Sequence, residues 1–417
     1  MAPATDLLRE LNSAAEAYVR LVLSVGHHDA DYVDAYYGPE ELKREVDREK
    51  PSLGMIRERA EGLRGTLRGL RPDGAEPMLQ LRHTYLSRQL EALHARTLML
   101  SGSRFTFDEE SKALYDAVAP VLPESYFQGI IGELDGLLPG RGSVPDRFEA
   151  YKREFVIPKE KLDVVFQAAI AEARLRTKHH VDLPGDERFT IEYVTGKSWS
   201  GYNWYKGGST SLIQINTDLP VYIDRAVDLA SHEGYPGHHV YNLLLEKHLV
   251  RERRWLEFTV YPLFSPQSLI AEGTANYGIA MAFPGDERST FERGVLFPRA
   301  GMEPGKAAEY YRIHELFLKL NYAGNEAARG YLDGAIDRQE AIRWLIEYGL
   351  FSPARAAQRT RFFDQYRSYV INYNLGQDLV GRYIESRGGT TEHPAKRWKE
   401  FTALLASPRL PSGLLPS

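Results

Sequence analysis

The sequence of 417 residues contains no cysteine. Disulfide bonds and thiolate ligands are therefore excluded, so any tightly held transition metal must be bound by His, Asp or Glu. The chain also has no excess of basic charge, because 52 Lys and Arg residues stand against 57 Asp and Glu residues, for a formal net charge of −5. Nucleic acid and anionic membranes bind to strongly basic surfaces, so neither is expected as a partner.

Long uncharged hydrophobic stretches are absent as well. No segment approaches the roughly 18 apolar residues that a membrane-spanning helix needs. The first 23 residues interrupt their apolar positions with Asp, Glu and Arg, which is typical of an amphipathic helix and not of a secretory signal. We therefore expect a cytoplasmic protein. With 43% hydrophobic residues, the chain can bury a large core.

Helical periodicity dominates what the sequence does contain. Apolar residues recur at three- and four-residue spacing near 4–25, 53–70, 78–101, 107–118, 158–180, 222–248, 266–282, 303–332, 337–349 and 353–385. Two β-rich runs, FTIEYVT at 189–195 and STSLIQIN at 209–216, predict a small sheet. The predicted fold is mainly α with a small β-sheet and a cleft between helical layers.

Three of the 12 histidines fall within eight positions, at 232, 238 and 239, and Glu233 follows the first of them directly. In zinc hydrolases, two histidines of one helix bind the ion, and the glutamate after the first takes a proton from water. The residue types occur here in that order. The spacing differs, because the second histidine comes six or seven residues after the first instead of four.

This spacing leaves the second ligand open between His238 and His239. On an unbroken helix of about 100° per residue, position 238 lies about 240° from His232, whereas position 239 returns to within about 20° of it. Pro236 disfavours an unbroken helix, because it removes a backbone donor and its ring clashes with the preceding turn. A bulge around Tyr235 and Pro236 would bring His238 beneath His232. We favour His238 and keep His239 as the alternative.

A third ligand is expected from the segment LIAEGTANYGIAMAF at 269–283. Glu272 is its only acidic residue, and buried carboxylates are rare unless they are paired or bind a metal. Gly273 and Ala275 would let this helix lie close against the helix that carries the histidines. Asn276, one turn after Glu272, is the candidate partner that orients a ligand histidine.

The two segments resemble the motifs of a known family. HEGYPGHHV at 232–240 and AEGTANY at 271–277 are similar to the His-Glu-x-x-Pro-Gly-His-His and Glu-Gly-x-Ala-x-Tyr motifs of the domain-of-unknown-function 885 family. The second motif also resembles the Glu-Gly-x-Ala segment of gluzincin peptidases. The resemblance implies a gluzincin-like architecture and one Zn²⁺ bound by His232, by His238 or His239, and by Glu272. It also implies that Glu233 is the general base.

The likeness extends from YVDAYYGPEEL at 32–42 to YNLGQDLVGRYIE at 373–385, and its last part singles out Tyr373. The family has a Tyr-x-Ile-Gly segment, of which this chain keeps Tyr373, Leu375 and Gly376. By this resemblance, Tyr373 would donate a hydrogen bond to the oxyanion that forms when water attacks the carbonyl group. Gly376 would leave room for a substrate or for the close approach of another helix.

A strand ahead of the histidine motif is a candidate for substrate binding. In gluzincins an edge strand lines the cleft and pairs with an extended peptide, and STSLIQINTDLP at 209–220 precedes the motif as such a strand would. An ordinary hairpin strand explains the segment equally well.

Together these observations predict a zinc-dependent hydrolase that acts as a metallopeptidase on an amide bond in a peptide. An N-terminal helical region, 1–145, would precede a catalytic region, 146–417, unless the two form one continuous unit. The alternatives are a zinc amidase of a small non-peptide metabolite and a non-catalytic helical binding protein with a structural metal. Glu233 argues against the last of these, because a structural site needs no base and usually has a fourth protein ligand.

Overall fold

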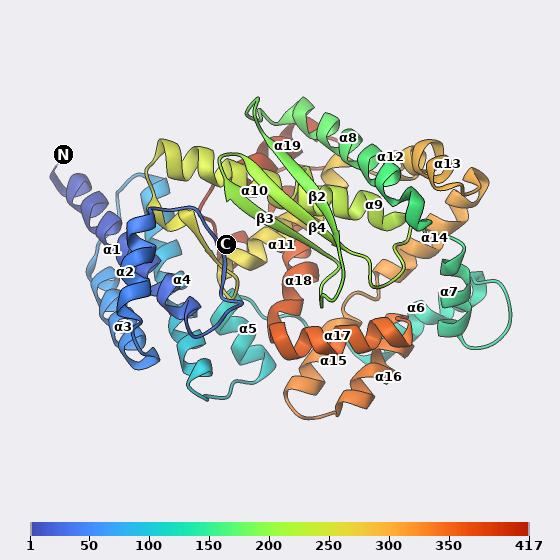
Figure 1. Ribbon diagram of the computed structural model, residues 1–417, viewed down its shortest axis with the longest axis horizontal. Coiled ribbons are helices and arrows are strands. Elements are labelled where there is room, and N and C mark those ends of the chain that lie inside the picture. The colour runs from blue at the N-terminus through green and yellow to red at the C-terminus, as the bar shows by residue number, and fades with distance from the viewer. Residues whose placement is uncertain (1, 416–417) are drawn as a thin grey trace.

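The computed structural model describes residues 2–415 and shows a mainly helical protein with two small sheets (Figure 1). The helices of the first half are α1 (Ala2–Gly26), α2 (Glu40–Glu49), α3 (Leu53–Gly69), α4 (Pro77–Leu100), α5 (Phe107–Tyr115), α6 (Glu124–Leu137), α7 (Val144–Arg153) and α8 (Leu162–His180). Those of the second half are α9 (Asp224–Leu229), the π-helical η2 (Ala230–Gly234), α10 (His238–Leu245), α11 (Pro266–Ala282), α12 (Glu287–Phe291), α13 (Phe297–Ala300), α14 (Ala307–Leu318), α15 (Ala323–Leu332), α16 (Arg338–Gly349), α17 (Pro353–Tyr366), the 3₁₀ turn η7 (Arg367–Val370), α18 (Ile371–Ser386) and α19 (Pro394–Leu405). The predicted fold class, mainly α with a small sheet, is confirmed.

The larger sheet has three strands in the order β2-β4-β3, namely β2 (Arg188–Val194), β4 (Thr210–Asn216) and β3 (Gly201–Gly207). Strand β4 pairs in parallel with β2 and antiparallel with β3. The prediction of two strands is confirmed for β2 and β4. Of the two interpretations left open for 209–220, the structure shows the hairpin strand, paired antiparallel with β3, and not the edge strand. Strand β4 has a neighbour on each side, and β3 lies at the edge. Strand β3 was not predicted, because Gly201, Asn203 and Gly207 are residues that strands disfavour.

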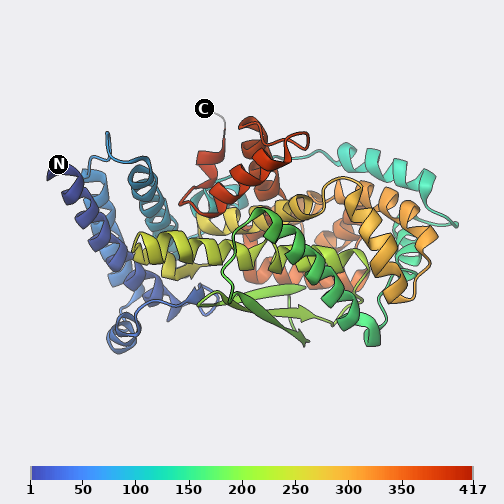
Figure 2. The same ribbon diagram turned by 90° about the horizontal axis from the view of Figure 1, so that it is seen from above.

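The sheet lies on one long face of the molecule, with helices behind it (Figure 2). A second, antiparallel sheet pairs β1 (Val33–Tyr36) with β5 (Val260–Pro262). The buried apolar side chains form one cluster that extends from Leu7 to Leu414. The division of the chain at residue 145 stays a prediction. Among the described residues, every helix falls short of the length and apolar character that crossing a membrane demands.

Proline begins several of the helices. Pro77, Pro266 and Pro353 are the first residues of α4, α11 and α17, where the missing N–H has no helical partner to lose and the fixed φ suits a helix. Ser352 then caps α17, because its side chain accepts a hydrogen bond from the backbone N–H of Arg355 at 3.3 Å. These local signals explain why the predicted starts of α11 and α17 agree with the structure.

Helices α11 and α18 meet at two glycines. A Cβ on Gly273 would lie 2.4 Å from the carbonyl carbon of Gly376, and a Cβ on Gly376 would lie 2.8 Å from the carbonyl oxygen of Leu269. The prediction that Gly273 allows a close approach to the histidine helix is therefore wrong in its partner. The close approach is to α18, and it brings Tyr373 on α18 near Glu272 on α11.

We expect Gly273→Ala to force α11 and α18 apart, because the added methyl group would overlap backbone atoms that cannot rotate away. The expected loss is about 1–3 kcal/mol in the free energy of unfolding, measured by denaturant titration. Gly62→Ala on the exposed side of α3, where nothing lies within 4 Å of the new Cβ, is the control and should keep or slightly raise stability. Equal stability of the two variants would contradict the tight contact.

Candidate metal centre

A widened helical turn brings His232 and His238 together. Helix α9 continues into the π-helical η2, and α10 begins again at His238. The backbone N–H of Gly237 donates to the carbonyl oxygen of Ser231 at 2.9 Å, six residues back instead of the four of an α-helix. The additional residues in this turn return His238 to the position beneath His232. The bulge that the proline predicts is confirmed.

Glycine at position 237 makes this turn possible. A Cβ on Gly237 would lie 1.9 Å from the carbonyl oxygen of His232 and 2.4 Å from that of Ser231. No side-chain carbon can approach backbone oxygens so closely, so any other residue would open the turn. The Pro-Gly pair of the motif therefore has a structural role that is separate from any chemistry.

His239, the alternative ligand, points away from His232 and His238. Its ring is fully buried, with Nδ1 2.8 Å from Ser211 Oγ and Nε2 3.2 Å from Glu187 Oε2. The helical rotation favoured His239 only for a continuous helix. Because the turn is widened, the helix is not continuous and this argument no longer applies. His239 instead links β4 to the segment before β2.

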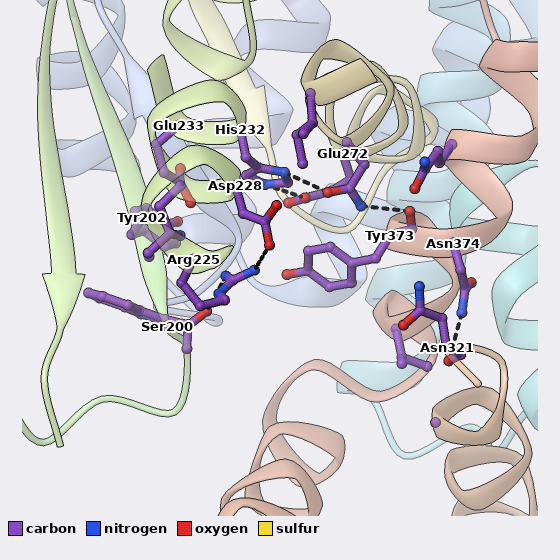
Figure 3. Close-up of a pocket in the computed structure, with 18 of the residues that line it drawn as sticks. Ser200, Tyr202, Arg225, Asp228, His232, Glu233, Glu272, Asn321, Tyr373 and Asn374 are labelled. Carbon is purple, nitrogen blue, oxygen red and sulfur yellow. Dashed lines mark hydrogen bonds and ion pairs between the residues drawn. The ribbon is translucent and has the colours of Figure 1, made fainter. Parts of the chain in front are cut away.

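Three ligand-type atoms converge on one buried point. His232 Nε2 and His238 Nε2 lie 3.1 Å apart, and Glu272 Oε2 lies 3.2 Å from the first and 3.6 Å from the second. Figure 3 shows the side chains of His232 and Glu272 directed toward each other. A tetrahedral zinc with bonds of about 2.0–2.1 Å separates its ligand atoms by about 3.3–3.4 Å. The observed separations bracket that value, so the group has the dimensions of a zinc site.

The electrostatics of the group also fit a cation. Glu272 Oε2 is buried and has no hydrogen-bond donor among the described residues. Burial opposes ionisation of Glu272, yet His238 and His232 hold the pKa of its carboxyl well below the usual range. Burial alone would lower the pKa of His232, but Glu272 and Glu233 outweigh it and raise that pKa to about 8. A buried carboxylate that faces two imidazole nitrogens is a donor set that a metal ion completes.

Neighbouring groups orient two of the three candidate ligands, His232 and Glu272. The amide nitrogen of Asn276 donates to the carbonyl oxygen of Tyr373 at 2.7 Å, so its Oδ1 faces His232 Nδ1 at 2.8 Å. Nδ1 must then carry the proton, which leaves the Nε2 lone pair directed at the convergence point. The hydroxyl of Tyr369 donates to Glu272 Oε1 at 2.7 Å, which leaves Oε2 for the same point. Asn276 thus lies where the sequence analysis expected it.

Glu233 lies beside the group, against the edge strand. The residue is only 4% exposed and lines the cleft. A Cβ on Gly201 of β3 would lie 2.8 Å from Glu233 Oε1, and Asn203 donates to the Glu233 carbonyl oxygen at 2.7 Å. Burial raises the pKa of the Glu233 carboxyl, although His232 and His238 oppose the shift. A carboxylate with a raised pKa is a better proton acceptor than an exposed one.

Tyr373 enters the cleft from α18. Its ring centroid lies 6.4 Å from that of His232, and Figure 3 shows its hydroxyl directed toward Arg225 and Asp228. Burial and the nearby Glu272 carboxylate raise the pKa of Tyr373 well above its usual value. The phenol is therefore protonated at neutral pH and able to donate a hydrogen bond.

Two residues near the group were missed by the sequence analysis. Tyr369, the donor to Glu272, lies in η7, and its ring is 5.8 Å from that of Tyr373. The one feature of the sequence that could have indicated Tyr369 is its place four residues before Tyr373. Asp34 on β1 lines the cleft and accepts a hydrogen bond from Tyr202. Burial and the carboxylates of Glu272 and Glu233 raise the pKa of Asp34 to about 8. The one feature of the sequence that could have indicated Asp34 is its position in the 32–42 segment, which belongs to the family resemblance.

The group lies in the wall of a cavity of about 580 Å³. Its lining includes residues of β3, of the loop before β3, and of α11, α17 and α18. Binding sites for small ligands typically measure about 300–1,000 Å³, so the cavity can accept a short peptide. The cleft that the sequence predicts is therefore present, and the candidate residues face it.

Comparisons with known proteins give a likeness in fold. No protein-family model matches the chain, and no curated protein matches it. A crystal structure of a candidate lipoprotein from Colwellia psychrerythraea is 15% identical, with a TM-score of 0.50, over 87% of this chain and 68% of that one. A lipoprotein candidate of unknown function from Shewanella oneidensis is 13% identical, with a TM-score of 0.37, over 87% and 75%. An M32 carboxypeptidase from Deinococcus radiodurans R1 is 13% identical, with a TM-score of 0.38, over 97% and 91%.

Proposed function

We propose that this protein is a zinc-dependent metallopeptidase that hydrolyses an amide bond of a peptide. The observation that carries the proposal is the convergence of His232, His238 and Glu272, with ligand-type atoms 3.1–3.6 Å apart, in the wall of a large cleft. Zinc bound there would polarise the scissile carbonyl group and lower the pKa of water toward about 7. Within residues 2–415, no fourth His, Asp or Glu joins the group, which favours a catalytic site over a structural one.

In this proposal, each residue around the metal has a separate role. Glu233 accepts the proton of the attacking water and passes it to the leaving amine. Tyr373 donates a hydrogen bond to the oxygen of the scissile carbonyl as negative charge develops on it. Asn276 and Tyr369 keep His232 and Glu272 in the orientation that binds the metal.

The edge of β3 favours a peptide substrate over a compact metabolite. Among the described residues, strand β3 pairs with β4 alone, so its other edge can form main-chain hydrogen bonds with an extended peptide. Gly201 places that edge against Glu233. A peptide paired with β3 would therefore pass beside the proposed base. A small amide needs no such strand to reach the base, so a free strand edge favours a peptide substrate.

We expect one zinc ion per chain in protein purified without added metal, because the site offers three ligands of the type that zinc prefers. Elemental analysis gives the stoichiometry, and a chelator should remove both the metal and any peptide hydrolysis, with zinc restoring both. His238→Ala should lose the metal, whereas His393→Ala, at an exposed histidine outside the group, should keep it. Protein that contains no zinc and binds none on titration would overturn the proposal.

A further inference from the structure

Two arginines of α17 face the cleft without an acidic partner. Arg355 and Arg359 lie one turn apart and line the same cavity as the candidate metal centre. Within the part of the chain that the structure describes, neither guanidinium group forms an ion pair. The Arg359 guanidinium instead lies over the rings of Phe362, at 4.5 Å, and Tyr373, at 5.8 Å.

Two carboxylates of the same cavity, Asp224 and Asp228, already have partners. Asp228 pairs with Arg225 at 3.0 Å and with Arg288 at 2.9 Å. Asp224 accepts hydrogen bonds from Lys152 at 3.2 Å and from Tyr310. Arg225 is satisfied in turn, because it also donates to Ser200 Oγ at 3.3 Å. Rearrangement of these neighbours would therefore leave another charge unpaired.

Around Arg355, like charges outweigh the opposite charge of Asp224. Burial and the guanidinium groups of Arg225 and Arg359 lower the pKa of Arg355 to about 10. Partly buried cations that repel one another are unfavourable unless an anion joins them. A guanidinium group binds a carboxylate through two parallel hydrogen bonds, which makes this anion the one that fits best.

The position of the pair relates it to the reaction. Tyr373 is a neighbour of both Arg359 and the candidate metal centre, since its ring lies 5.8 Å from the guanidinium carbon of Arg359 and 6.4 Å from the ring of His232. Figure 1 shows α17 crossing one end of α18. An anion held by Arg359 would therefore lie beside Tyr373, the proposed donor to the scissile carbonyl group.

We propose that Arg355 and Arg359 bind a carboxylate group of the substrate next to the bond that is cleaved. The substrate class rests on the proposed peptidase function. In a peptide, the carboxylate is supplied either by the C-terminus or by an Asp or Glu side chain. The first source would make the enzyme remove residues from the C-terminal end, and the second would make it cleave beside acidic residues.

The experiment compares three libraries of N-acetylated pentapeptides. One has free C-termini and no acidic residues, the second is the same library with amidated C-termini, and the third is amidated and contains Asp or Glu. We expect the wild type to cleave the first or the third library in preference to the second. Arg359→Gln and Arg355→Gln should each lower kcat/KM on the preferred library by about 10- to 100-fold, as for the loss of a charge-assisted hydrogen bond, and should leave the second library unaffected. Arg361→Gln, on the exposed side of α17, is the matched control and should change nothing.

A binding measurement separates this proposal from the peptidase proposal. In zinc-loaded Glu233→Gln protein, the first or the third library should raise the melting temperature more than the second, and Arg359→Gln should remove that rise while zinc content stays the same. Equal cleavage of all three libraries, or a thermal shift that survives both arginine substitutions, would overturn the anion site. Failure to cleave any library, together with an arginine-dependent thermal shift, would instead reject the peptidase function and retain the anion site.

Discussion

Glu233→Gln should abolish hydrolysis and leave zinc bound. The amide has the shape of the carboxylate but cannot accept a proton, and a general base contributes about 100- to 10,000-fold to a rate. Glu233 is not among the three residues whose ligand-type atoms converge, so its replacement leaves the metal ligands in place. Its side chain is held against Gly201 of β3, and glutamine occupies the same space.

The measurement combines turnover on a cleaved peptide with zinc content and melting temperature. Glu252→Gln, at an exposed carboxylate distant from the cleft, serves as the control and should behave as the wild type. Loss of zinc together with activity would make Glu233 a ligand or a support of the site. Unchanged turnover would remove it from the mechanism.

The local chemistry of the histidine motif allowed its geometry to be predicted. Pro236 excludes a continuous helix, and Gly237 is required by contacts of 1.9 and 2.4 Å with backbone oxygens. Both effects act within a few residues of His232, so they are contained in the sequence of the motif. The same holds for Asn276, whose place one turn after Glu272 follows from helical spacing alone.

Features that depend on distant contacts could not be predicted. The sequence predicts one helix over 353–385, yet the chain breaks at Arg367, with a φ of 53°. Glu110 of α5 stabilises the break by accepting hydrogen bonds from Arg367 at 2.6 Å and from the Ser368 hydroxyl at 2.6 Å. Because these partners are more than 250 residues apart, no local pattern reveals the break. It sets the start of α18 and hence the direction of Tyr373.

The order of the strands also depends on contacts between residues distant in sequence. The alternation in 209–216 predicts a strand, but whether that strand is central or at an edge depends on β2 and β3 pairing with it. Likewise, Gly273 signals a close helix contact without revealing that Gly376 is the partner. Periodicity reports which side of an element is buried, and only the complete fold determines what covers it.

Tyr373→Phe should lower turnover by about 100- to 1,000-fold, roughly 3–4 kcal/mol in transition-state stabilisation, as expected for the loss of one oxyanion donor. The phenol is suited to this role because its pKa lies well above the usual value, so it is a donor at every pH at which the enzyme would work. Removal of the hydroxyl leaves the ring in place beside His232 and Arg359. Zinc content and melting temperature should therefore barely change.

Tyr369→Phe provides the contrast that makes this test specific. Tyr369 donates to Glu272 at 2.7 Å, so its hydroxyl supports the metal ligand, and its loss should weaken zinc affinity by about 10- to 100-fold. The two tyrosines belong to the same stretch of chain and their rings are 5.8 Å apart, so a general disturbance of η7 and α18 would affect both variants alike. At saturating zinc, only Tyr373→Phe should keep a large defect in kcat. A decrease in kcat of less than about threefold is too small for an oxyanion donor, and a large fall in melting temperature would assign the Tyr373 hydroxyl to the packing of the core.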